Sequence, residues 1–522
     1  MEMGYSDFIV TVSFIVIVSM FFAPILFIAY LYIKNKSQTQ HSLLRGRYWF
    51  LGILRYLIEN VGPEFRFYIT DEDLDGKPIS REKFTTIVKA SKYLKTVISF
   101  GSKRNFSEPG IYIKNSLFPK LATEQKLDTT LKFETKRYII DKESIFFRHE
   151  HIAPFKIRRW LLEEEDAIIV GEDKASPWRV LGQVGMSAMS FGALGKNSIR
   201  ALSHGIGMIG GSWMNTGEGG LSGYHLEGQP DTVVQIGPAL FGVRDKDGGL
   251  SVSRLQEIAA LENVKAFEIK LGQGAKVRGG RLDGAKVSPE IAKIRNVEPW
   301  KLLQSPNRFT FINNESDLFD FVEKIQDLTG KPVGVKIVVG GQGSLDLFVK
   351  EFVKRGRGPD FITIDGSEGG TGSTYKEMAD SLGLPIFPAL IHVVDTLNRA
   401  NIRSKVKIIA AGKLHLPDEI AIALALGADL VANARGLMIS IGCIMAHKCH
   451  TNNCPVGVAT NDPKLQRSLY VDEKKYRVVN YITTLRAGLF NLAAACGLDT
   501  PTKFSREHLS ISDEKYNISA IK

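Results

Sequence analysis

The stretch FITIDGSEGG, residues 361–370, is a run of apolar and β-branched residues that ends in a glycine cluster. It decides the fold because the same pattern recurs along the chain. From about residue 178 onward, each such run is followed by a helical stretch. The other runs are VLGQVGMSAMSFG (180–192), AFEIKLGQG (266–274), VGVKIVVGG (333–341), VKIIAAG (406–412) and LVANARG (430–436). Apolar strands that alternate with helices indicate parallel β/α units. The sequence therefore predicts an α/β fold, with a (β/α)8 TIM barrel as the first choice.

The glycine clusters at the strand ends of such a barrel lie on one face, where ligands bind. A doubly wound sheet is the structural alternative, but no GxGxxG stands between a strand and a helix as a dinucleotide-binding fold requires. Two late runs end in small residues at 410–412 and 433–436. Because phosphate-binding barrels use the loops after strands seven and eight, these two loops predict a phosphate site, to which Arg435 would add a bidentate contact.

Residues 8–33 carry no charge and exceed the roughly 20 residues that a membrane span requires. Acidic residues precede this segment and basic residues follow it: Glu2 and Asp7, then Lys34, Lys36, Arg45 and Arg47. By the positive-inside tendency, the pattern predicts a single-pass anchor in the cell membrane with the catalytic domain in the cytoplasm. A hydrophobic hairpin buried within a soluble protein is the alternative.

The composition is that of a globular protein, with 522 residues, 44% hydrophobic, 24% charged and a net charge of +11. A basic surface suits anionic lipid or an acidic electron-transfer protein, or serves solubility alone. Basic tracts interleaved with aromatic residues are missing, so no nucleic-acid partner is expected. We expect four parts: the transmembrane anchor (8–33), a small mixed N-terminal extension (34–155), the barrel (156–475) and a C-terminal helical tail (476–522). In the extension, Ser80 is predicted to cap a helix, and no catalytic chemistry is recognised.

Three of the four cysteines, Cys443, Cys449 and Cys454, lie within twelve residues in GCIMAHKCHTNNCPVGVAT (442–460). Such clustering, with Pro455 after the last cysteine, favours an iron–sulfur centre. A disulfide would leave one cysteine unpaired, zinc would need His447 or His450 as a fourth ligand, and three unrelated buried cysteines are the remaining alternative.

Lysines stand in two of the predicted strands. Alternation points Lys270 to the same side of its strand as Glu268, and Lys336 repeats the pattern in VGVKIVVG. A cation inside a barrel is costly unless it meets a negative partner, such as a reduced flavin ring or a carboxylate substrate. Structural ion pairs are the alternative for each lysine.

Five stretches, SAMSFGAL (187–194), NTGEGG (215–220), EIKLGQGAK (268–276), GSEGGTGS (366–373) and the cysteine motif, resemble in order the FMN-binding synthase domain of glutamate synthase. The resemblance covers about residues 160–470. It implies a barrel that binds FMN and a 3Fe-4S cluster held by Cys443, Cys449 and Cys454, and that reduces 2-iminoglutarate to glutamate. With its anchor, the chain is similar to short stand-alone glutamate synthase-like proteins.

The resemblance also implies roles for single residues. Those near the flavin ring would be Ser187, Ala188, Met189, Thr216, Gln235 and Lys270, and those near its phosphate Gly412 and Arg435. Gln273 and Lys276 would hold the carboxylates of 2-oxoglutarate, and Glu218, Lys336 and Glu368 would line the same mouth. The chain departs from the family pattern at Arg278 and Arg281, and at Leu240 where a basic residue is usual.

The expected substrates are 2-oxoglutarate or a related 2-oxo acid, with ammonia from solution or from a partner. No cysteine precedes Cys443, so the N-terminal nucleophile of a glutamine amidotransferase is missing, and about 115 residues are too few for that domain. No Rossmann unit for NADPH is recognised, so ferredoxin or a reductase subunit is the expected electron donor. The alternatives are amination of another 2-oxo acid, transfer of an amine such as methylamine, and a membrane-tethered electron-transfer or sensory module.

Overall fold

The computed structural model describes residues 5–37, 49–99, 101–128, 132–143, 148–274, 276, 280–513 and 518–521. The chain divides into two compact units, Met1–Gly76 and Lys77–Lys522. The first unit holds α1 (Tyr5–Ser37), α3 (Trp49–Phe65) and the π-helix η1 (Arg66–Thr70). Within the described residues, one helical segment, Phe8–Ser37, is long and apolar enough to cross a membrane, judged by length and composition alone.

The second unit is built on a sheet of eight parallel strands in the order β6-β15-β14-β13-β12-β9-β8-β7. The two ends of this order, β6 and β7, lie beside each other, so the sheet curls into a nearly closed barrel. The predicted (β/α)8 barrel is therefore confirmed. In chain order its strands are β6 (Val184–Met186), β7 (Trp213–Asn215), β8 (Asp231–Ile236), β9 (Val264–Lys270), β12 (Val333–Ile337), β13 (Phe361–Asp365), β14 (Lys407–Ala411) and β15 (Leu430–Asn433).

Six of these strands fall in the runs predicted from the sequence, whereas β7 and β8 do not. β7 reads Trp-Met-Asn and contains no β-branched residue, so it lacks the pattern by which the other strands were recognised. β8 begins with the polar residues Asp231 and Thr232 and carries Gln235 on its buried side, which breaks the β-branched texture.

Bulky apolar side chains close the amino-terminal end of the barrel. Trp178, from the short hairpin of β4 (Ile168–Val170) and β5 (Trp178–Val180), packs edge-on against Trp213 at 5.4 Å and Phe361 at 6.5 Å between ring centroids. A Cβ atom on Gly185 would lie 2.2 Å from the Trp213 ring, so this position in β6 has no room for a side chain. Because this end is filled, a ligand must enter from the carboxyl ends of the strands.

Helices surround the barrel. They are α5 (Lys196–Ile209), α6 (Gly223–Leu226), α7 (Val252–Ala259), α8 (Pro289–Arg295), α9 (Glu315–Thr329), α10 (Asp346–Arg355), α11 (Lys376–Ala379), α12 (Ile386–Arg399), α13 (Pro417–Ala425), α14 (Arg435–Ser440) and α15 (Pro463–Gln466), followed by the long α16 (Val471–Ala495). A small two-stranded ribbon, β10 (Arg281–Leu282) with β11 (Leu303–Gln304), lies between β9 and β12 in the sequence.

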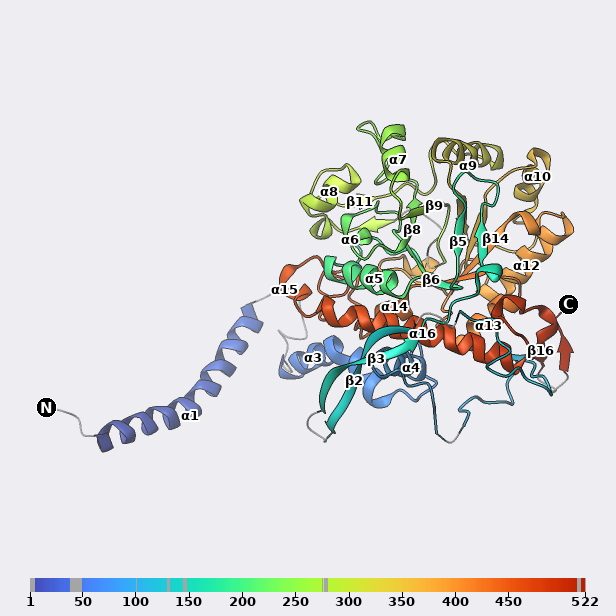
Figure 1. The fold of residues 1–522 in the computed structure, drawn as a ribbon. Coiled ribbons are helices and arrows are strands. Elements are labelled where there is room, and N and C mark those ends of the chain that lie inside the picture. The colour runs from blue at the N-terminus through green and yellow to red at the C-terminus, as the bar shows by residue number, and fades with distance from the viewer. Residues whose placement is uncertain are drawn as a thin grey trace. The chain divides into compact units, whose positions relative to one another are not determined.

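The part of the N-terminal extension that belongs to the second unit, from Lys77 onward, packs on α16, on the side away from the barrel (Figure 1). It contains α4 (Arg81–Tyr93) and the hairpin of β2 (Lys132–Glu143) and β3 (Arg148–Arg158). The predicted cap is confirmed, because the Ser80 hydroxyl accepts a hydrogen bond from the Lys83 backbone nitrogen at 3.3 Å. Buried Asn480 of α16 ties the parts together by donating to the carbonyl oxygens of Ser91 and Lys136, each at 2.9 Å.

The C-terminal tail was expected to be helical, and beyond α16 it also forms strands. β16 (Leu509–Ser512) pairs with β1 (Gly110–Ile113) of the extension on one side and with β17 (Ile518–Ala520) on the other. The strand form is stabilised by a pairing partner about 400 residues earlier in the chain, which local sequence does not reveal.

Candidate active site

Three of the residues proposed for catalysis meet in one cluster at the carboxyl end of β9. Lys270, the last residue of β9, donates from Nζ to Glu218 Oε1 and to Gln273 Oε1, both at 2.9 Å. Gln273 in turn donates from Nε2 to the carbonyl oxygen of Gly370 at 3.0 Å. The alternation argument placed Lys270 inside the barrel, and the structure has it there with only 5% of its surface exposed.

Two further cations surround Glu218. Lys276 is 4% exposed and donates from Nζ to the carbonyl oxygen of Ser373 at 2.8 Å. Burial, together with repulsion by Lys270, lowers the pKa of Lys276 to about 8. Arg295, at the end of α8, is also 4% exposed; it donates to the Phe191 carbonyl oxygen at 3.1 Å, and its Nε has no partner among the described residues.

Sequence reasoning missed Arg295. The residue stands at the end of the helical stretch PEIAKIR, where a basic residue in the last turn ordinarily serves the helix dipole at the surface. Its burial was the missing signal, and burial depends on which helix face the barrel covers.

The cluster carries an excess of positive charge. Burial alone would raise the pKa of Glu218, but Lys270, Lys276 and Arg295 hold it below its usual value. Three cations face this one carboxylate, so positive charge exceeds negative charge around Glu218. Buried surplus charge is costly unless an anion shares the site, so the cluster fits an anionic ligand.

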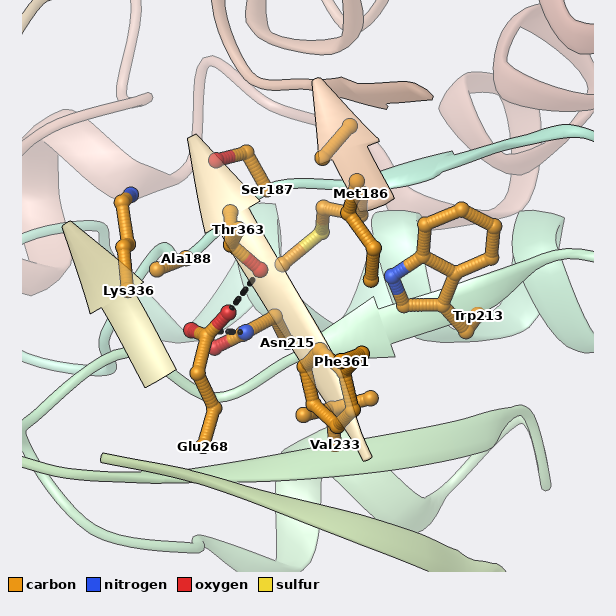
Figure 2. A pocket seen from close by; sticks show the side chains of 12 residues that line it. Met186, Ser187, Ala188, Trp213, Asn215, Val233, Glu268, Lys336, Phe361 and Thr363 are labelled. Atoms are coloured by element: carbon orange, nitrogen blue, oxygen red, sulfur yellow. Dashed lines mark hydrogen bonds between the residues drawn. The ribbon is translucent and has the colours of Figure 1, made fainter. Parts of the chain in front are cut away.

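A small cavity lies beneath this mouth, inside the barrel (Figure 2). At its centre, buried Glu268 accepts hydrogen bonds from Asn215 Nδ2 at 2.9 Å, Gln235 Nε2 at 2.6 Å and Thr363 Oγ1 at 2.5 Å. The residues lining the cavity are Met186, Ser187, Ala188, Trp213, Asn215, Val233, Glu268, Lys336, Phe361, Thr363, Ile409 and Ala432. The structure thus brings Ser187, Ala188 and Lys336 together at one cavity.

Lys336 forms an ion pair with Asp365, with 3.1 Å between Nζ and Oδ2. Burial would lower the pKa of Lys336, but Asp365 and Glu268 raise it above its usual value, so the side chain stays an ammonium ion. Asp365 Oδ2 also accepts from the backbone nitrogen of Gly274 at 3.0 Å, which fixes the loop after β9. Asp365 was not predicted as a site residue.

Three residues expected at the flavin ring hold the neighbouring loops together. The Thr216 hydroxyl donates to the Gly217 carbonyl oxygen at 3.0 Å and accepts from the Gln235 backbone nitrogen at 3.1 Å. The Gln235 side chain donates to Glu268, and Met189 donates from its backbone nitrogen to the Asn215 carbonyl oxygen at 3.3 Å.

The two predicted phosphate loops meet beside Glu368. Gly412, directly after β14, has φ of +150°, and a Cβ there would come within 3.1 Å of Ile386. Arg435, directly after β15, donates from Nη2 to the Glu368 carbonyl oxygen at 3.4 Å, and its buried Nη1 has no partner among the described residues. The Glu368 carboxylate accepts from the Ile386 backbone nitrogen at 3.0 Å and so sits at the start of α12. An anion at this place would meet the free donor of Arg435.

The three clustered cysteines line one hollow, formed with Met438, Val458 and neighbouring residues. Burial raises the pKa of the Cys443 thiol to about 12 and also raises that of Cys449. No three His, Cys, Asp or Glu side chains in the described part of the chain converge closely enough for a single metal ion. Cys496, at the end of α16, does not line this hollow.

Two cations, the buried Lys286 and the partly buried Arg435, face the thiols. Lys286, 2% exposed, donates from Nζ to the carbonyl oxygens of Ala193 at 2.8 Å, Cys449 at 3.1 Å and Ala459 at 3.2 Å. Burial lowers the pKa of Lys286 to about 8, while Cys449 and Cys454 act in the opposite direction. Arg435 approaches the same thiols from the phosphate loops. Soft donors around one hollow with buried cations beside them fit an anionic cluster, whose thiolates need not converge on one ion.

Comparisons with known proteins agree with this architecture. Residues 122–499 match a family model described as a conserved region in glutamate synthase. A glutamate synthase large subunit-like protein, YerD, of Bacillus subtilis (strain 168) is 49% identical over 496 residues, which are 95% of this chain and 94% of that protein. A ferredoxin-dependent glutamate synthase of Antithamnion sp. is 35% identical over 294 residues, 53% of this chain and 19% of the relative.

An archaeal NADPH glutamate synthase of Archaeoglobus fulgidus is 33% identical over 299 residues, 57% of this chain and 55% of the relative. Among solved structures, a mandelate oxidase with a monooxide FMN adduct aligns with a TM-score of 0.42 and 12% identity, covering 90% of this chain and all of that one.

Proposed function

The chain belongs to the glutamate synthase family, and from that premise we propose that it converts 2-oxoglutarate and ammonia into glutamate with the help of FMN and an iron–sulfur cluster. As a member of this family it is an oxidoreductase of the glutamate synthase type, a class that acts on CH–NH2 donors. The observation that carries the substrate proposal is the gathering of three buried cations, Lys270, Lys276 and Arg295, around Glu218.

The surplus charge supports a dicarboxylate substrate. Lys276 would exchange its hydrogen bond to the Ser373 carbonyl for one to a substrate carboxylate, and Arg295 would use its unpaired Nε in the same way. Gln273 forms a backbone bridge with Lys276 and accepts a hydrogen bond from Lys270, and its amide would orient the chain of the substrate. Glu218, held ionised by its cationic neighbours, would attract the positively charged nitrogen of 2-iminoglutarate.

The departures from the family pattern do not enter this cluster as far as the structure describes them. Arg281 lies exposed in β10, and Arg278 falls outside the described residues. Leu240 is a buried apolar residue in the loop after β8. The described residues around Glu218 are therefore compatible with 2-oxoglutarate, which we take as the proposed substrate.

The residues at the barrel mouth fit FMN. Ser187, Ala188 and Lys336 would border the ring, and Gly412 and Arg435 would receive the single phosphate, with the unpaired Nη1 of Arg435 as a ready donor. FMN would supply the hydride for reduction of the imine. A nearby ammonium such as Lys336 favours negative charge on a reduced ring.

Cys443, Cys449 and Cys454 fit a 3Fe-4S cluster, whose negative charge the buried Lys286 and the partly buried Arg435 would compensate. The cluster would supply electrons one at a time. Ferredoxin or a reductase subunit is the proposed donor, and ammonia would come from solution or from a glutaminase partner. We further place the helix Phe8–Ser37 as a cell-membrane anchor with the barrel on the cytoplasmic side.

One anaerobic experiment tests the reaction. The full-length protein is purified, its flavin is reduced with dithionite, and reoxidation is followed after adding 2-oxoglutarate with ammonium, each alone, or a panel of other 2-oxo acids with ammonium. The proposal expects rapid reoxidation only with the complete pair, with glutamate as product. Reoxidation by no 2-oxo acid would point to an electron-transfer module, and preference for another acid would replace the substrate.

A further inference from the structure

The N-terminal extension, in which the sequence showed no chemistry, reaches the phosphate loops of the barrel through one side chain. Helix α4 lies against α14 and α16. From its first turn, Lys83 donates from Nζ to Glu419 Oε1, in α13. The partners are 336 residues apart in the chain, and the Glu419 side chain is only 15% exposed.

Glu419 also forms hydrogen bonds with the loop that follows β14. Its Oε2 accepts hydrogen bonds from the backbone nitrogens of His415 at 2.8 Å and Leu416 at 3.1 Å. These bonds fix the turn between Gly412 and the start of α13. Lys83 neutralises the carboxylate that holds this turn in place.

The loop after β15 belongs to the same network. Asn433 donates from Nδ2 to the Leu414 carbonyl oxygen at 2.9 Å and to the Tyr481 hydroxyl at 3.1 Å. Tyr481, on α16, donates to the His415 carbonyl oxygen at 2.8 Å. Both phosphate loops are thus tied together, and the extension holds them from outside through Lys83.

Charge at this place is also in surplus. Lys413 is half-buried and directly follows Gly412. Burial lowers its pKa, repulsion by Arg435, Lys77 and Lys83 lowers it further, and attraction by Glu368 raises it. Cations therefore outnumber the carboxylates of Glu368 and Glu419 beside the two loops. A phosphate monoester at neutral pH carries nearly two negative charges. A positive surplus at this place favours binding of a terminal phosphate.

We infer that Lys83 is a positioning residue for the flavin phosphate: through Glu419 it holds the 412–416 turn, and with Lys77 it adds positive potential to the phosphate pocket. The inference rests on the proposed FMN site. It assigns to the extension the task of making the barrel selective for a phosphorylated flavin over riboflavin.

The test compares two ligands that differ only in the phosphate. Deflavinated full-length protein is titrated with FMN and with riboflavin, following quenching of flavin fluorescence, for the unaltered chain and for Lys83→Met, Lys83→Arg and Lys89→Met. Lys89 is an exposed residue on the same helix and serves as the matched control. Far-UV circular dichroism and melting temperature check that each variant is folded.

We expect Lys83→Met to weaken FMN binding by about fivefold and riboflavin binding by less than about twofold, a modest effect because Lys83 is 38% exposed. Lys83→Arg should restore most of the loss, and Lys89→Met should change neither affinity. Equal losses for FMN and riboflavin, or none for either, would overturn the role of Lys83. If the unaltered chain bound FMN no more tightly than riboflavin, the proposed phosphate-binding site for FMN would itself be wrong.

Discussion

The ammonium group of Lys286 lies 3.1 Å from the carbonyl oxygen of Cys449, so the segment that follows β9 is bonded directly to the cysteine loop. The same nitrogen reaches Ala193 in the loop after β6 and Ala459 at the end of the cysteine motif. One buried cation therefore joins three segments, and it lies beside two of the thiols proposed to hold the cluster.

Replacing Lys286 by Met should loosen the cysteine loop, because three buried carbonyl oxygens lose their charged donor. We expect a cost of about 2–4 kcal/mol in unfolding free energy. Iron and sulfide content per chain should fall as well. Urea unfolding and iron analysis measure the two effects, and Lys293→Met, an exposed position on α8, is the control. Full iron content in Lys286→Met would contradict the proposal that Lys286 holds the cysteine loop in place for the cluster.

The ligand set of the cluster is tested at two cysteines. Cys449→Ser should abolish the electron paramagnetic resonance signal of an oxidised 3Fe-4S centre, because Cys449 lines the hollow with Cys443 and Cys454. Cys496→Ser should leave that signal intact. Equal loss in both variants would make Cys496 a fourth ligand and indicate a 4Fe-4S centre.

Arg295 should contribute to binding of 2-oxoglutarate. Replacing it by Ala removes a buried charged donor, which is worth about 1.5–3 kcal/mol in a charge-assisted hydrogen bond, so KM should rise about 10- to 100-fold. Lys276→Ala should act in the same direction, and flavin content should not change in either variant. Steady-state kinetics with 2-oxoglutarate measure the effect. An unchanged KM in Arg295→Ala would remove Arg295 from the substrate site.

Substrate affinity should depend on pH through Lys276, whose pKa is lowered to about 8 in the folded protein by burial and by Lys270. The ammonium form binds a carboxylate, so KM for 2-oxoglutarate should rise as pH increases through about 8. The free energy of unfolding depends on pH in the opposite direction. Between about pH 8 and the usual lysine pKa, Lys276 binds more protons in the unfolded chain than in the folded one. The cost of burying Lys276 therefore falls, and the folded protein gains stability, as pH rises through this range.

The KM profile between pH 7 and 9.5 gives the measurement. Lys276→Arg should keep its charge to higher pH and flatten the profile. A profile of the same shape in Lys276→Arg would assign the titration to another group.

Local sequence was enough to predict a structural feature wherever the interactions that stabilise the feature involve residues close together in the chain. Strands β9, β12 and β13 stand out as mainly apolar runs because both faces of a parallel barrel strand are buried, and the Ser80 cap depends on its own helix alone. The alternation of β9 likewise placed Lys270 inside the barrel. The cysteine spacing predicted an iron–sulfur centre, which stays a prediction; the three thiols do line one hollow, because only a short loop separates them.

The tertiary structure decided what depends on neighbours distant in the chain. Arg295 faces Glu218 only because α8 packs against the barrel mouth, and Asp365 pairs with Lys336 only because β12 and β13 are adjacent. Lys83 meets Glu419 across 336 residues. The free energy of a buried charge depends on which charges surround it after folding. The spacing of residues along the sequence does not reveal those neighbours.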